Sequence, residues 1–245
     1  MTDRKHVSPQ AGPGGIASAP KGDAMVESFL SEAKRLGPVG ADARPRLIFA
    51  LDATMSRQPT WDLACRVQGE MFAAADTVGG LSVQLIYFRG FEECRSSRWV
   101  IAGRALTDLM GRIDCRGGHT QIARVLRHAR NEAAQGPIRA LVYVGDAMEE
   151  PMDELCALAG ELGLLGIKTF MFHEGHDPSA ARAFQEMARL SGGVYARFDA
   201  AAPRSLAELL RAAATYASGG VDGLRRLADR DAAARGLLAS MNAPR

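Results

Sequence analysis

The chain has 245 residues, of which 47% are hydrophobic and 24% charged, so it can form one α/β domain with a large core. Its formal net charge of +2 shows neither the basic surplus of a nucleic-acid-binding protein nor the acidic surplus of a solvating tail. No apolar run reaches the length of about 20 residues that spans a membrane, and residues 1–10 lack the apolar core of a secretion signal. We therefore expect a cytoplasmic protein with no nucleic-acid or membrane partner. Its four scattered cysteines are expected to be reduced: Cys65, Cys94, Cys115 and Cys156.

The N-terminal part of the chain differs in composition from the rest. Residues 1–23 are rich in Gly, Pro, Ala and Ser and contain no aromatic residue. This composition predicts disorder, because too little apolar surface is present to offset the entropy of ordering. Residues 24–44 are predicted to form a short helix, with Val26, Phe29 and Leu30 at helical spacing, followed by a linker punctuated by Gly and Pro.

Apolar strands alternate with amphipathic helices over residues 45–218. Strands are predicted at 46–54, 81–90, 97–101, 139–148, 167–175 and 194–199. Helices are predicted at 60–75, 105–113, 120–134, 152–166, 179–193 and 205–218. Such alternation requires crossover connections, so the expected fold class is α/β: a doubly wound, mostly parallel six-stranded sheet with helices on both faces and one short antiparallel edge strand. Residues 219–245 are expected to form a C-terminal helical tail without a strong apolar stripe.

Two of the buried strands end at an aspartate, Asp52 and Asp146. In an open α/β sheet, ligands bind at the carboxyl ends of the strands, in the crevice where the winding direction reverses. If these two strands are neighbours across that reversal, both carboxylates converge on the crevice. Two carboxylates a few ångströms apart repel strongly unless a cation lies between them.

Hydroxyl groups accompany the two aspartates. The run DATMS places Asp52, Thr54 and Ser56 at alternate positions, which share one side of an extended loop. The run GGHT adds the hydroxyl of Thr120 from another loop, whose two glycines permit unusual backbone angles. Two carboxylates and three hydroxyls are hard oxygen ligands that suit Mg²⁺, Mn²⁺ or Ca²⁺.

This pattern resembles the metal-ion-dependent adhesion site (MIDAS) of von Willebrand factor A domains, in particular those of bacterial intracellular members. That family has an Asp-x-Ser-x-Ser run after its first strand, a distant threonine, and an aspartate after its fourth strand. Here DATMS (52–56), GGHT (117–120) and GDAM (145–148) stand in the same order, and the resemblance covers residues 45–218. One departure is Thr54, which keeps the hydroxyl of the usual serine but adds a methyl group.

The resemblance implies a function and roles for the residues. Thr54 and Ser56 would bind the ion directly, with Asp52, Thr120 and Asp146 binding it directly or through water. One coordination position would stay open for an acidic residue of a partner protein. The expected function is therefore a protein-interaction module and not an enzyme. The sequence indicates neither the partner nor the oligomeric state.

Other interpretations of these residues stay open. One alternative is that Asp52 and Asp146 simply cap the helices that follow them. The run from His173 to His176 lacks the spacing of a helical HExxH zinc site and is interpreted as a polar loop. Exposed carboxylates near the rim are either solvated or influence which partner approaches: Glu92, Glu93, Glu149 and Glu150.

Two other functions compete with the interaction module. A magnesium-dependent phosphoester hydrolase is compatible with an oxygen-ligated ion. A haloacid-dehalogenase-type phosphatase, however, would need a second carboxylate at the position of Thr54, and the sequence shows no lysine nearby. The other alternative is a scaffold whose metal site is vestigial.

Overall fold

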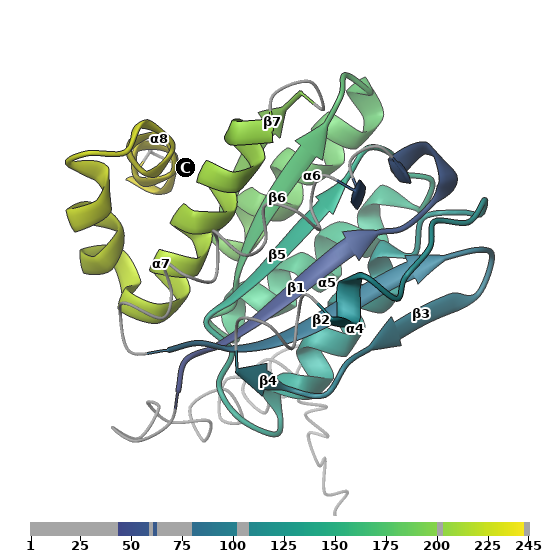
Figure 1. Cartoon of the computed structure of the whole chain (residues 1–245), viewed down its shortest axis with the longest axis horizontal. Coiled ribbons are helices and arrows are strands. Elements are labelled where there is room, and N and C mark those ends of the chain that lie inside the picture. The colour runs from purple at the N-terminus through teal and green to yellow at the C-terminus, as the bar shows by residue number, and fades with distance from the viewer. Residues whose placement is uncertain (1–43, 59–60, 63–79, 102–107, 200–202, 243–245) are drawn as a thin grey trace, which may run out of the picture. The chain divides into compact units, whose positions relative to one another are not determined.

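The computed structural model describes residues 44–58, 61–62, 80–101, 108–199 and 203–242. A single sheet runs through this part of the chain (Figure 1). Its strands are β1 (Arg46–Asp52), β2 (Ser82–Arg89), β3 (Glu93–Ser96), β4 (Val100–Ile101), β5 (Ala140–Gly145), β6 (Lys168–Glu174) and β7 (Val194–Phe198).

The strand order is β3-β2-β1-β5-β6-β7, and β4 also pairs with β2. The five long strands are parallel to one another, with Leu51 opposite both Tyr87 of β2 and Val144 of β5. The chain winds from β1 to β2 in one direction and from β5 to β7 in the other. The winding therefore reverses between β1 and β5, so the condition stated for the two aspartates is met and the carboxyl ends of these strands are neighbours at the switch point.

The predicted fold class is confirmed, with a difference at the sheet edge. In place of one edge strand at 97–101, two short segments, β3 and β4, both pair antiparallel with β2. Between them the edge bends around Ser97, whose hydroxyl accepts a hydrogen bond from the Leu85 N–H at 3.0 Å. At this point the Leu85 N–H of β2 is hydrogen-bonded to a side chain and not to a backbone carbonyl of the edge strand. The edge is therefore divided into two strands, and the sheet has seven strands.

The helices cover both faces of this sheet. Their bounds are η1, a 3-10 helix (Met55–Arg57), α4 (Ile122–Ala133), α5 (Met152–Leu164), α6 (Pro178–Ser191), α7 (Pro203–Ala228) and α8 (Ala232–Asn242). None of the described helices is long and apolar enough to cross a membrane. The predicted segments 1–23 and 24–43, most of the predicted helix 60–75 and residues 105–107 of the predicted helix 105–113 lie outside the described residues. Within the second of these helices, residues 108–110 are helical and 111–112 form a turn, so it ends earlier than predicted.

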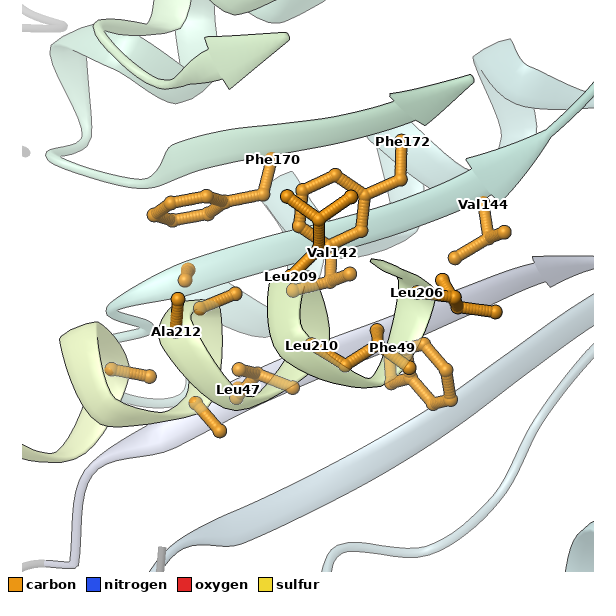
Figure 2. Close-up of a cluster of buried hydrophobic side chains, with 14 of the residues drawn as sticks. Leu47, Phe49, Val142, Val144, Phe170, Phe172, Leu206, Leu209, Leu210 and Ala212 are labelled. Atoms are coloured by element: carbon orange, nitrogen blue, oxygen red, sulfur yellow. The ribbon is translucent and has the colours of Figure 1, made fainter. Parts of the chain in front are cut away.

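Alternate residues of the buried strands point into two separate cores. On β1, Leu47, Phe49 and Leu51 lie in the core that includes α7, whereas Ile48 and Ala50 lie in the core that includes α4, α5 and α6. All five are essentially inaccessible to solvent. Figure 2 shows the leucines of α7 lying against apolar side chains of β1, β5 and β6. Burial on both faces explains why these strands appear in the sequence as continuous apolar runs.

The C-terminal segment packs more closely than its sequence suggested. The predicted helix end at 218 corresponds to a kink at Gly220, beyond which α7 continues to Ala228. Asp231 then accepts a hydrogen bond from the Ala234 N–H at 2.9 Å and pairs with Arg211 of α7, so it joins the start of α8 to α7. Leu224 and Leu237 are buried in the same core as β1.

The run from His173 to Asp177 is a strand end and a helix cap. The His173 ring is fully buried, with its Nδ1 3.0 Å from the Tyr195 hydroxyl. Asp177 accepts a hydrogen bond from the Ala180 N–H at 2.7 Å and so caps α6, which begins with Pro178. The sequence predicted a polar loop over the whole run, but His173 and Glu174 belong to β6 and His173 is buried, so the loop is shorter than predicted.

We predict that Leu210→Ala lowers the free energy of unfolding by about 2–5 kcal/mol, because Leu210 is fully buried between α7 and the sheet. The matched control is Leu164→Ala, since Leu164 is 58% exposed and its truncation should change stability by no more than about 0.5 kcal/mol. Urea unfolding followed by circular dichroism measures both. Equal losses in the two variants would contradict the packing of α7 described above.

Candidate metal centre

The segment after β1 folds back on itself around Asp52. One carboxylate oxygen of Asp52, Oδ1, accepts a hydrogen bond from the Thr54 N–H at 2.8 Å. The chain then enters η1, so the run is not extended throughout, as the sequence analysis assumed. The hydroxyl oxygens of Thr54 and Ser56 nevertheless lie 3.2 Å apart. Asp52 and Thr54 are buried, whereas Ser56 is exposed. The three oxygen-bearing side chains of this run therefore extend from the interior of the domain to its surface.

The loop before α4 is tied to the ends of β1 and β2. Backbone hydrogen bonds join the Arg116 N–H to the Ala53 carbonyl at 3.0 Å and the His119 N–H to the Gly90 carbonyl at 3.1 Å. Arg89, the last residue of β2, binds the Asp114 backbone carbonyl and carboxylate at 2.7 and 2.6 Å. These bonds hold the loop that carries Thr120 against the strand ends.

Gly118 is required in this loop by close packing. Neither Gly117 nor Gly118 has a left-handed φ, so the unusual backbone angles expected from the sequence are not the reason for these glycines. A Cβ at Gly118 would lie 2.0 Å from the Gly90 carbonyl oxygen, whereas a Cβ at Gly117 would meet no atom within 4 Å. Only a residue without a side chain lets the loop approach the end of β2 so closely.

Thr120 is held by the loop that carries Asp146. Its hydroxyl oxygen accepts a hydrogen bond from the Glu149 N–H at 3.0 Å, and its own N–H donates to the Glu149 carboxylate at 2.9 Å. The neighbouring Glu150 accepts hydrogen bonds from the N–H groups of Ile122 and Ala123 at 2.6 and 2.8 Å. The two glutamates are therefore anchors: Glu149 positions Thr120, and Glu150 caps α4.

Asp52 and Asp146 bring two carboxylates to one region at the switch point. The pKa of Asp52 is raised to about 6, chiefly because the carboxyl group is buried and to a smaller extent because the Asp146 carboxylate is near. The hydrogen bonds from Thr54 and the charge of Arg57 lower this pKa and so oppose the effect of burial. Asp52 Oδ2 and Asp146 Oδ1 are buried and receive no hydrogen bond from any residue within the described ranges. One oxygen atom on each strand end thus has no hydrogen-bond partner among the residues that the structure describes.

The sequence analysis missed Arg57, the residue that follows the DATMS run. Its side chain is only 2% exposed and forms an ion pair with Glu174 at the end of β6. Burial lowers the pKa of this guanidinium, while the Asp146 and Asp52 carboxylates raise it. The sequence contains one indication of Arg57, which is its position directly after DATMS. A cation at that position lies close to any metal site that the DATMS side chains form.

The donor set fits a hard divalent cation. The two orphaned carboxylate oxygens and the hydroxyls of Thr54 and Ser56 are all oxygen ligands, as Mg²⁺, Mn²⁺ and Ca²⁺ require. The Thr120 hydroxyl oxygen accepts a hydrogen bond from the Glu149 N–H, in the loop that also carries Asp146. In the part of the chain that the structure describes, no cluster holds three or more His, Cys, Asp or Glu side chains suited to a metal. A metal here therefore needs the hydroxyls as well as the carboxylates.

Comparison with known proteins supports the fold. No family model matches the sequence, and no curated protein matches it either. Solved structures do match, among them a von Willebrand factor type A protein from Catenulispora acidiphila (16% identity, TM-score 0.54, covering 71% of this chain and 43% of that one). The SpRpn10 VWA domain matches with 10% identity and a TM-score of 0.51, covering 67% of this chain and 95% of that one. The chain thus has the fold of a von Willebrand factor A domain.

A third match bears on the metal. Proximal thread matrix protein 1 from the mussel byssus, in a form whose MIDAS motif is occupied by zinc, has 14% identity and a TM-score of 0.52. The match covers 70% of this chain and 46% of the mussel protein. The chain therefore spans less than half of the mussel protein, as it does of the Catenulispora protein.

We predict that Gly118→Ala lowers the melting temperature by about 2–10 °C, because the new methyl group displaces the loop from Gly90 at a cost of about 1–3 kcal/mol. Gly117→Ala is the matched control and should melt within about 1 °C of the wild type, since nothing lies near its Cβ. Differential scanning fluorimetry measures both. Identical melting temperatures for the two variants would show that the loop does not pack as described.

Proposed function

We propose that the chain is a protein-interaction module that binds a divalent cation and recognises an acidic residue of a partner protein through it. The cation is Mg²⁺, or alternatively Mn²⁺ or Ca²⁺. The residues proposed to hold it are Asp52, Thr54, Ser56, Thr120 and Asp146.

The observation that carries this proposal is the pair of orphaned carboxylate oxygens at the switch point. Burying a charged oxygen without a partner is costly, and Asp52 Oδ2 and Asp146 Oδ1 are buried with no hydrogen-bond partner in the described part of the chain. A cation between them removes the cost for both at once. The von Willebrand factor A fold and the zinc-occupied MIDAS motif of the mussel protein give further support.

The partner's acidic residue follows from the chemistry of such an ion. An octahedral divalent cation held by few protein ligands keeps coordination positions for outside oxygen atoms, and a carboxylate adds negative charge where the ion is positive. Exposed side chains close to this edge, Met55 at 58% and Phe91 at 73% exposure, offer apolar contact area for a protein. We propose that the module acts in the cytoplasm, where the free thiols of Cys94 and Cys156 stay reduced.

We predict that Asp52→Asn weakens Mg²⁺ binding by at least about tenfold, because it removes a charge next to the ion. An asparagine oxygen can still accept the hydrogen bond from Thr54, so the local fold should persist. Isothermal titration calorimetry with Mg²⁺ and Mn²⁺ measures the affinities. The matched control is Asp222→Asn, an exposed aspartate on α7 that pairs with Arg225 and should leave the affinity unchanged. If neither Mg²⁺ nor Mn²⁺ binds to the wild type, the proposed metal site is wrong.

A second prediction concerns the partner. Proteins captured by the immobilised wild type in Mg²⁺ should be released by EDTA and should not be captured by Asp52→Asn. Capture that is insensitive to EDTA would argue against recognition through the ion. A phosphatase assay on the same samples tests the hydrolase alternative, and metal-dependent turnover that Asp52→Asn abolishes would favour that alternative.

A further inference from the structure

Arg57 crosses the strand ends of the proposed metal centre. It is the last residue of η1, directly after β1, yet its partner Glu174 is the last residue of β6. In the sheet, β5 lies between β1 and β6. The ion pair therefore joins the segment after β1 to the end of β6, and the strand between them, β5, is followed by Asp146.

The guanidinium is enclosed in this position. Only 2% of the Arg57 side chain and 13% of the Glu174 side chain are exposed, so water screens their charges poorly. Burial lowers the pKa of Arg57, and the Asp146 and Asp52 carboxylates act in the opposite direction, as expected of a cation beside the two of them. Arg57 likewise acts on Asp52, whose pKa it lowers.

The charges of these four groups do not cancel. Asp52, Asp146 and Glu174 supply three carboxylates, and Arg57 supplies one cation. Arg57 and Glu174 neutralise each other as a pair, which leaves the charges of the two strand-end aspartates. The positive member of that pair faces those aspartates, and it opposes the entry of a second cation.

We infer that Arg57 is a built-in counter-ion of the proposed metal centre, which supports the two aspartates without a metal and weakens their hold on one. Glu174 restrains the guanidinium at the end of β6 and so keeps it from occupying the space between the aspartates. The inference rests on the proposed metal binding and adds to it a residue that sets the affinity.

The two partners of the ion pair should therefore have opposite effects on Mg²⁺ affinity. Arg57→Gln removes the opposing charge and should tighten Mg²⁺ binding by about tenfold or more. Glu174→Gln frees the guanidinium to move toward Asp146 and Asp52 and should weaken binding. Calorimetric titration of each variant with Mg²⁺ gives the affinities, and thermal unfolding in EDTA and in saturating Mg²⁺ gives a second readout. In EDTA, Arg57→Gln should melt below the wild type, and Mg²⁺ should raise its melting temperature more.

Two double variants complete the design. Arg57→Gln with Glu174→Gln removes both members of the ion pair, so neither member is left buried without the other and the variant should fold even if the single variant does not. It should still bind Mg²⁺ more tightly than the wild type, because the guanidinium is the member of the pair that acts on Asp52. The matched control, Arg127→Gln with Glu154→Gln, removes an exposed ion pair between α4 and α5 and should leave the affinity within about twofold.

The outcomes distinguish this inference from the proposed function. Equal Mg²⁺ affinities in the wild type and both Arg57 variants would overturn the role of Arg57 and leave the metal site standing. Binding by the Arg57 variants alone would support the counter-ion and overturn metal binding by the wild type. No binding by any of these proteins, in titrations that also include Mn²⁺, would overturn both.

Discussion

The parallel pairing of β1 with β5 is the constraint on which the rest of this site depends. It joins the two halves of a doubly wound sheet at the point where the winding reverses. Each of the two strands is followed or ended by an aspartate, so the pairing brings two carboxylates into one poorly solvated region. Their repulsion has to be balanced, and the surrounding groups are understood most simply as parts of that balance: the Thr54 N–H, the Arg57 guanidinium and the proposed cation.

The loops around the aspartates are held by backbone contacts and by acidic side chains. Gly118 lets one loop approach Gly90, and Glu149 joins that loop to the one after β5 through two hydrogen bonds. Glu150 accepts from the first free N–H groups of α4, a position that favours a negative charge because of the helix dipole. Carboxylates that look like solvated rim residues in the sequence thus fix the geometry of the site. The site is organised by contacts within the chain, which lowers the entropic cost of binding an ion there.

The similarity to solved structures says less about the function of this chain than the residues at the end of the sheet do. At 10–16% identity, the matches with the Catenulispora, SpRpn10 and mussel proteins establish a shared fold, and a fold of this kind hosts many functions. In this chain, Thr54 of the proposed ligand run is followed three residues later by a buried arginine, Arg57. Thr54 keeps its hydroxyl within 3.2 Å of Ser56, so the added methyl group does not separate the two oxygens. Arg57 is the feature that a comparison of folds alone does not reveal.

The sequence by itself determined the strand and helix order, because apolar runs and helical periodicity are local properties. They can be recognised without knowing which segments pack together. It also determined that Asp52 and Asp146 end buried strands, and hence that they meet if their strands pair. Only the tertiary structure decided how the edge of β2 divides, why Gly118 has no side chain, and that Leu224 and Leu237 are buried. It alone placed Arg57 against Glu174, 117 positions further along the chain. Contacts between distant segments follow from the packing of whole elements, and the pattern within any one segment does not contain that information.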